Sequence, residues 1–128
     1  MGRAAAPISV LLVEDELLIS NLVADKLTEH GFAVHEVATG DEALRYINSG
    51  EKVDVMFTDV NLPGGIDGTE LAIRVRDMRP DMPIVYASGR YSASGLGQMV
   101  SRSVFVPKPY RPAEVCTLLH RLTIAVAQ

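Results

Sequence analysis

The chain has 128 residues, a mass of 13.9 kDa and a formal net charge of −4. With 48% hydrophobic and 22% charged residues and one cysteine, Cys116, it has the composition of a single globular domain, which excludes a disordered, collagen-like or disulfide-rich chain. There is no apolar run of about 18 residues and no secretory signal, and the charge is acidic, so we expect a cytoplasmic protein that neither spans a membrane nor binds nucleic acid directly.

Short apolar runs alternate with amphipathic windows along the chain, which predicts strands and helices in turn. We expect residues 1–6 to form an N-terminal tail and residues 7–128 to form one domain. In chain order the expected elements are a strand at Ile8–Val13, a helix at Glu16–His30, an edge strand at Phe32–Ala38, a helix at Asp41–Asn48, a strand at Val53–Thr58, a loop at Asn61–Gly68, a helix at Gly68–Arg79, strands at Pro83–Ala87 and Ser103–Val106, and a helix at Arg111–Ala127.

Two of these windows carry more specific expectations. In the segment Tyr91–Arg102, Gly95 and Gly97 each weaken a helix by about 1 kcal/mol relative to alanine, so both a weak, mobile helix and an ordered loop stay open there. In the first helix, apolar side chains recur at helical spacing and we expect this stripe to face the sheet. The stripe consists of Leu18, Leu22, Val23 and Leu27.

The alternation of strands and helices predicts an α/β fold, a doubly wound five-stranded parallel sheet with helices on both faces. Ligands bind such sheets beyond the carboxyl ends of the strands, so the residues that follow each strand are candidates for a site. Singly, each has an ordinary explanation as a helix cap, a turn residue or a solvated side chain, but together they predict a functional cluster at one edge. They are Glu14, Asp15 and Glu16 after the first strand, Asp59 at the third, Ser88 at the fourth and Lys108 at the fifth.

The charge distribution allows two interpretations. Residues 1–67 carry 12 acidic and 4 basic side chains, whereas residues 68–128 carry 4 acidic and 8 basic ones. Either these charges are solvated helix faces, or the first half builds an acidic site that cations from the second half close. Carboxylates about 5 Å apart repel by roughly 3 kcal/mol at an effective dielectric constant near 20, so such a site calls for protons or a bound cation.

Oxygen ligands of this kind suit Mg²⁺, with Mn²⁺ as a substitute, whereas the scattered histidines His30, His35 and His120 disfavour zinc. The chain has no glycine-rich phosphate loop, which argues against a bound nucleotide or flavin. A carboxylate at the end of the third strand, close to Mg²⁺ and a lysine, instead favours covalent phosphoryl transfer to Asp59.

Four segments carry a resemblance to a known family. They read VLLVEDE (Val10–Glu16), FTDVNLP (Phe57–Pro63, with Asp67-Gly68 shortly after), VYASG (Val85–Gly89) and FVPKPY (Phe105–Tyr110). In this order and at these intervals, they make the chain resemble receiver domains of two-component response regulators over about residues 7–127. The resemblance implies a flavodoxin-like sheet with strand order 2-1-3-4-5, and a stand-alone receiver domain at residues 7–128.

The resemblance also implies a role for each candidate residue. Asp59 looks like the phosphoacceptor that forms an aspartyl phosphate. Lys108 is expected to bind the phosphoryl group, Ser88 to be the switch hydroxyl and Phe105 the switch aromatic, and the Lys108–Pro109 bond is expected to be cis. The expected metal ligands are Asp15, Asp59, the backbone carbonyl of Asn61 and, through a metal-bound water, Glu14.

The function implied by the resemblance is a phosphorylation-activated signalling switch. A sensor histidine kinase or phosphotransfer protein donates the phosphoryl group with Mg²⁺, and the surface of the fourth helix, fifth strand and fifth helix changes for a downstream protein target. Such a protein is not an enzyme in the usual sense, although it catalyses its own phosphorylation and dephosphorylation. A phosphorylation-dependent homodimer stays open.

Two departures from the family pattern keep an alternative open. Glu14 stands where most members carry aspartate, and the loop from Asp59 to Asp67 is one residue longer than usual, with Gly64-Gly65 taking up the excess. The alternative is a pseudo-receiver, which binds a protein constitutively and is never phosphorylated. A small phosphohydrolase or flavin protein of similar fold is disfavoured by the missing phosphate loop and the short chain.

Overall fold

The computed structural model describes residues 6–89 and 99–127, with the side chains of residues 125–127 left out. Most of the expected tail at residues 1–6 lies outside the described residues. The same holds for the segment expected as a weak helix, Tyr91–Arg102, as far as residue 98. Among the described residues, every other expected strand and helix is present, with ends that differ by at most two residues from the expected ones.

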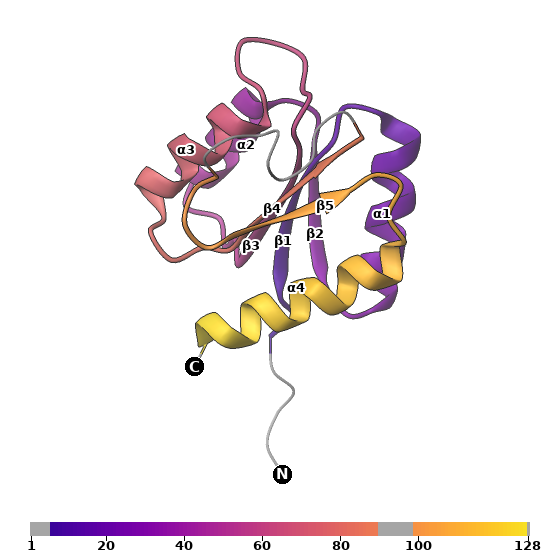
Figure 1. Cartoon of the computed structure of the whole chain (residues 1–128). Coiled ribbons are helices and arrows are strands. Elements are labelled where there is room, and N and C mark those ends of the chain that lie inside the picture. Colours follow the sequence, from indigo (N-terminus) through magenta and orange to yellow (C-terminus); the bar gives the residue numbers. More distant parts are fainter. Residues whose placement is uncertain (1–5, 90–98, 128) are drawn as a thin grey trace.

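Five parallel strands form one sheet in the order β2-β1-β3-β4-β5, as expected (Figure 1). The strand order reverses beside β1, which is where a doubly wound sheet opens a binding crevice. The strands are β1 (Ser9–Val13), β2 (Ala33–Val37), β3 (Val55–Asp59), β4 (Ile84–Ser88) and β5 (Ser103–Pro107). The helices are α1 (Leu17–Glu29), α2 (Gly40–Asn48), α3 (Gly68–Met78) and α4 (Pro112–Ala127).

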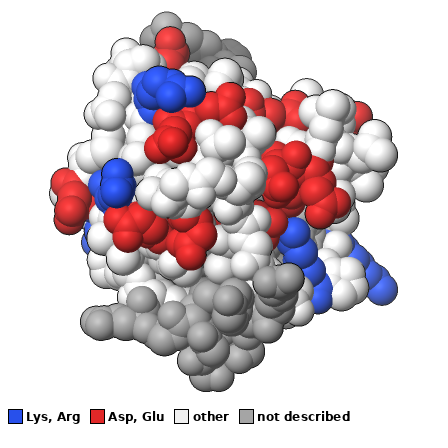
Figure 2. Space-filling view, turned by 90° about the horizontal axis from the view of Figure 1, so that it is seen from above, with Lys and Arg blue, Asp and Glu red and all other residues white. Residues whose placement is uncertain are grey.

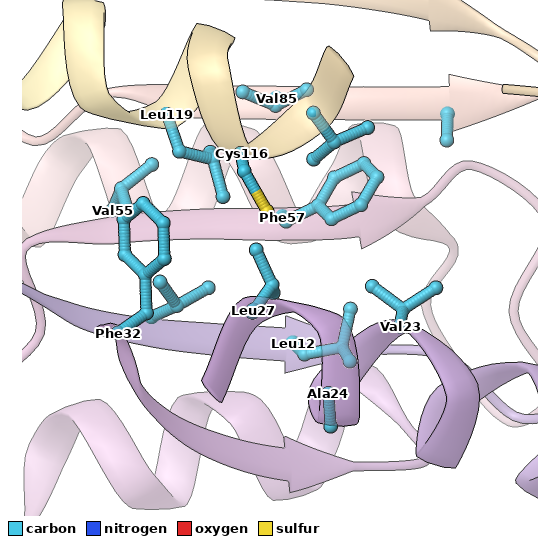
Figure 3. Close-up of a cluster of buried hydrophobic side chains, with 13 residues drawn as sticks. Leu12, Val23, Ala24, Leu27, Phe32, Val55, Phe57, Val85, Cys116 and Leu119 are labelled. Carbon is cyan, nitrogen blue, oxygen red and sulfur yellow. The ribbon is translucent and has the colours of Figure 1, made fainter. Parts of the chain in front are cut away.

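Each face of the sheet packs against two helices, because successive residues of a strand point to opposite faces. On one face α1 and α4 cover Leu12 and Phe57, and Figure 3 shows this cluster between the sheet and the two helices. On the other face α2 and α3 cover Leu11 and Met56. The central strands β3 and β4 are buried along their whole length, which explains their unbroken apolar runs.

The expected inward face of α1 is partly wrong. Val23 and Leu27 are buried as expected, but the side chains of Leu18 and Leu22 are 84% and 65% exposed. The buried face instead includes Ser20, whose hydroxyl donates a hydrogen bond of 2.7 Å to the Glu36 carboxylate of β2. Ser20, Val23, Ala24 and Leu27 form the buried face of α1, and Leu18 and Leu22 lie outside it. None of the described helices is long and apolar enough to cross a membrane.

Candidate functional site

The candidate residues meet at the carboxyl edge of the sheet, which is the edge that Figure 2 views from above and where acidic side chains gather. Glu14 and Asp15 follow β1, and Asp59 is the last residue of the neighbouring β3. One carboxylate oxygen from each of the three residues lies within 4.8 Å of the other two. Glu14 and Asp59 are buried, with 5% and 9% exposure, whereas Asp15 is exposed.

Lys108 places its ammonium group between the two buried carboxylates. Its Nζ lies 3.3 Å from Asp59 Oδ2 and 3.5 Å from Glu14 Oε1. The backbone of Lys108 is tied to β4, because its N–H donates to the carbonyl of Ser88 at 2.9 Å. The Lys108–Pro109 bond is cis, as expected. The first half of the chain therefore supplies the acids, and the second half supplies the cation that pairs with them.

Both oxygens of the Glu14 side chain have partners, one in the turn after β1 and one after β5. The Glu14 N–H continues the sheet by donating to Val37 of β2 at 3.0 Å. Its Oε2 accepts the N–H of Glu16 at 3.1 Å, a local turn contact two residues along the chain, while Oε1 faces Lys108. The longer arm of glutamate therefore bends back on its own backbone and still reaches the lysine.

Burial dominates the electrostatics of the site. It raises the pKa of Asp59, and the Lys108 ammonium and an N–H donated by Asn61 offset this only in part. Burial likewise raises the pKa of Glu14 against the opposing effects of the Glu16 N–H and Lys108. For Lys108, burial alone lowers the pKa, but the carboxylates of Asp59 and Glu14 outweigh it and the pKa is raised. The single positive charge of Lys108 therefore does not balance the negative charge that three clustered carboxyl groups can carry.

This donor set fits a magnesium ion. The cluster offers hard carboxylate oxygens and no histidine or cysteine, which is the chemistry Mg²⁺ prefers. Two buried carboxyls with raised pKa gain most from an added positive charge. Glu14, Asp15 and Asp59 are the side chains that would hold the ion.

The remaining expected site residues lie around this cluster. Asn61 is exposed in the turn after β3, and its N–H donates to the Asp59 carboxylate. Ser88 ends β4 with 1% exposure. Phe105 is half-buried in β5, where it pairs in register with Tyr86 of β4 and packs against the α2–α3 side of the core. The fold thus brings the expected residues to the ends of β1, β3, β4 and β5.

Two contributors to the site were not predicted from the sequence. Tyr110 lies below the acids, lines a small cavity with Glu14 and Asp59, and packs edge-on against Phe57 with ring centroids 5.4 Å apart. Burial, with the carboxylates of Glu14 and Asp59, raises the Tyr110 pKa to about 12, so its phenol stays protonated. The aromatic residue directly after Lys108-Pro109 is the only sequence signal for this role.

The second contributor that was not predicted is Gly68, the first residue of α3. A Cβ atom there would lie 2.1 Å from the Asp59 carbonyl oxygen and 2.8 Å from Val60 Cα, so any side chain would push on the backbone that carries Asp59. The Gly68 N–H also donates to the Val60 carbonyl at 2.7 Å. The preceding Asp67 caps α3 by accepting the N–H groups of Thr69 and Glu70, which explains why an Asp-Gly pair stands here.

The comparisons with known proteins agree on one protein family. The family model of the response regulator receiver domain matches residues 10–120. The sensor kinase CckA of Brucella abortus is 31% identical over 118 residues, which cover 89% of this chain and 12% of that protein. The transcriptional regulatory protein TcrA of Mycobacterium tuberculosis is 33% identical over 127 residues, which cover 95% of this chain and 49% of that protein. This chain therefore spans half or less of the length of these relatives.

Solved structures agree with the family model. The crystal structure of a response regulator receiver protein from Sinorhizobium medicae matches with a TM-score of 0.87 and 31% identity, covering 94% of this chain and 97% of that one. A receiver domain structure from Methanospirillum hungatei, described as CheY-like, matches with a TM-score of 0.84 at 23% identity, which supports the fold.

Proposed function

Because the chain belongs to the response regulator receiver domain family, we propose that it is a phosphorylation-activated switch whose phosphoacceptor is Asp59. The observation that carries this proposal is the surrounding of the Asp59 carboxylate at the end of β3. It lies within 4.8 Å of two other carboxylates and 3.3 Å from the Lys108 ammonium. Acids at one side and a fixed cation at the other suit a metal-assisted transfer of a phosphoryl group.

In the proposed reaction, an Asp59 carboxylate oxygen attacks the phosphorus of a phosphohistidine in line with the P–N bond. The new O–P bond gives an aspartyl phosphate, and the P–N electron pair returns to the donor imidazole, which takes up a proton. Mg²⁺, when bound, supplies positive charge at the phosphoryl oxygens. Lys108 is already within ion-pair distance of Asp59, so its ammonium can neutralise the transferred oxygens with little movement.

The proposed output starts from Ser88 and Phe105. Ser88 ends β4 beside the site and is joined to Lys108 by a backbone hydrogen bond of 2.9 Å. A hydroxyl that turns toward the phosphoryl group vacates space next to β5, and the half-buried Phe105 is placed to follow it inward. This movement would alter the surface of β5 and α4, which a downstream protein target or a second copy of the chain reads; the fourth helix expected in that surface falls largely on residues outside those that the structure describes.

The names of the relatives agree with such partners. One relative is named a sensor kinase and another a transcriptional regulatory protein. For this chain we propose a sensor histidine kinase or phosphotransfer protein as phosphodonor and a protein as downstream target. The single cysteine, Cys116, is buried and free, which supports a reducing compartment such as the cytoplasm.

Incubation with acetyl phosphate and Mg²⁺, followed by intact-mass measurement, tests the proposal. We expect one added phosphoryl group on the wild-type chain, none on Asp59→Asn, and none when EDTA removes the metal. The matched control is Asp54→Asn, which removes an acid near the opposite end of β3 and should leave the mass gain intact. An unmodified wild-type chain would favour the constitutive pseudo-receiver instead, whereas an equal gain in Asp59→Asn would show that Asp59 is not the phosphoacceptor.

A further inference from the structure

The loop that follows Asp59 is held at both of its ends. It runs from Val60 to Asp67, and Figure 1 shows it projecting from the carboxyl edge of the sheet between β3 and α3. At its base, the Gly68 N–H donates to the Val60 carbonyl at 2.7 Å. At its start, the Asn61 N–H donates to the Asp59 carboxylate. The position of this loop therefore bears directly on the proposed phosphoacceptor.

A contact with α2 supports the side of the loop that is farther from Asp59. Ile66 packs over Gly40, the buried first residue of α2. A Cβ atom on Gly40 would lie 2.5 Å from Cγ1 and 2.7 Å from Cδ1 of Ile66, so the isoleucine occupies the space that a side chain at position 40 would need. The tip of the loop is open, because a Cβ atom on Gly65 would meet nothing within 4 Å. The loop thus rests on α2 through Ile66.

The capping box at the start of α2 makes this support firm. Thr39 accepts the Glu42 N–H at 3.1 Å, and the Glu42 carboxylate accepts the Thr39 N–H at 3.1 Å. Just before the cap, the carbonyl of Val37 accepts the Glu14 N–H at 3.0 Å. The acidic turn after β1 is therefore joined through the end of β2 to Gly40, on which the loop after β3 rests.

We propose that Ile66, seated on Gly40, is a positioning residue for phosphoryl transfer. It holds the loop so that the Asn61 N–H stays on the Asp59 carboxylate and orients it for attack. Misplacement of reacting groups by about 1 Å can slow a reaction by roughly a hundred-fold, so a displaced loop would have a measurable effect. This inference rests on the proposed function, because it assigns a positioning contact to the same reaction.

Substitutions at the two positions test the contact through its geometry. Gly40 does not have a positive φ, so alanine fits the backbone there and only space opposes it. Gly40→Ala should slow phosphorylation by acetyl phosphate with Mg²⁺ about five- to twenty-fold, because the new methyl group collides with Ile66. Adding Ile66→Ala removes the colliding atoms and leaves the carbonyl oxygen of residue 66 in ordinary contact at 3.6 Å. The double variant should therefore react within about three-fold of the wild-type rate.

The amide signal of Asn61 in ¹H–¹⁵N spectra separates positioning from general stability. It reports on the hydrogen bond to the Asp59 carboxylate, and should shift in Gly40→Ala and return toward its wild-type position in the double variant. Gly65→Ala, in the open tip of the same loop, is the matched control and should change neither the signal nor the rate.

A second variant covers the case in which Gly40→Ala does not fold, as judged by circular dichroism. Ile66→Ala alone removes the side chain that rests on α2, so it should slow phosphorylation about two- to five-fold and shift the Asn61 signal. In that background Gly40→Ala fills the vacated space and should speed the reaction up again.

The outcomes distinguish the inference from the proposed function. If the wild type is phosphorylated, but Gly40→Ala slows the reaction by the same factor with and without the Ile66 side chain, the positioning contact is refuted and the proposed function stands. An unchanged rate or an unchanged Asn61 signal in folded Gly40→Ala would also overturn the inference. If the wild-type chain takes up no phosphoryl group, the proposed function fails and the inference fails with it.

Discussion

The crowding of carboxylates around Asp59 predicts that the phosphoacceptor destabilises the metal-free protein. Unit charges 4.8 Å apart repel by about 3.5 kcal/mol at an effective dielectric constant of 20, and Asp59 meets two such neighbours at or within that distance. The attraction to Lys108 at 3.3 Å offsets about 5 kcal/mol. Counted in full, these effects leave a net repulsion of about 2 kcal/mol, which screening of the exposed Asp15 lowers and burial of the charged Asp59 carboxylate raises. We therefore expect Asp59→Asn to raise the free energy of unfolding by about 1–2 kcal/mol.

The pH dependence of this gain follows from the raised pKa of Asp59, which burial causes. A carboxyl group whose pKa is raised by folding lowers the free energy of unfolding as the pH rises from its unfolded-state pKa to its folded-state pKa. Below the unfolded-state pKa it is protonated in the folded and the unfolded chain alike and has no such effect. The advantage of Asp59→Asn should therefore be full at neutral pH and vanish below about pH 4, where the carboxyl of the unfolded chain is protonated as well.

Urea unfolding in EDTA, followed by circular dichroism, measures the difference. Asp25→Asn, which removes an exposed acid from α1, is the matched control and should change stability by less than about 0.5 kcal/mol. Saturating Mg²⁺ should stabilise the wild type more than Asp59→Asn and so narrow the gap between them. An Asp59→Asn protein less stable than the wild type in EDTA at neutral pH would refute the account of a strained acidic cluster.

Three further predictions, each made by substitution, test other parts of the structure. Lys108→Ala removes the only ion-pair partner seen for Glu14 and Asp59 among the described residues, so it should lower the free energy of unfolding in EDTA by about 2 kcal/mol. Mg²⁺ should restore part of this loss. Unchanged urea unfolding would contradict the ion pairs of Lys108 with the two carboxylates. Gly68→Ala should lower stability in thermal unfolding by about 2–3 kcal/mol and slow phosphorylation by acetyl phosphate. Gly65→Ala is the matched control and should leave stability nearly unchanged, because a Cβ there meets nothing within 4 Å. Equal effects of the two substitutions would contradict the close approach of Gly68 to the Asp59 backbone. Leu18→Gln should change stability by less than about 0.5 kcal/mol, because Leu18 is exposed, while Leu27→Ala should lower stability by about 2–5 kcal/mol, because Leu27 is buried. A large loss of stability in Leu18→Gln would instead support the inward-facing position predicted for Leu18 from periodicity.

Much of the fold and of the site could be predicted because both depend on local patterns. Apolar runs such as the one ending at Thr58 mark strands that are buried on two faces, and parallel strands carry their carboxyl ends to one edge. Asp59 and Lys108 could therefore be placed together although 49 residues separate them along the chain. The family motifs then supplied the strand order, which periodicity alone leaves undetermined.

The parts that could not be predicted depend on contacts between distant elements. The orientation of α1 depends on how the helix packs against the sheet and α4, where Val23, Ala24 and Leu27 are covered, so a hydrophobicity pattern alone misplaces Leu18. Glu14 could be placed at the acidic edge from its position after the first strand, but its contact with Lys108 depends on how β5 carries the lysine. Gly68 belongs to an Asp-Gly pair that the family motif includes, but its role depends on the empty space beside the Asp59 backbone, which only the fold reveals.

Mapping the phosphoryl group to a residue tests the central claim most directly. Borohydride reduces an aspartyl phosphate to homoserine, which peptide mass spectrometry detects as a residue change at one position. After treatment with acetyl phosphate and Mg²⁺, the account predicts this change at position 59 alone, and its absence when EDTA is present. An unchanged Asp59 in a phosphorylated chain, or the same change at Glu14 or Asp15, would contradict it.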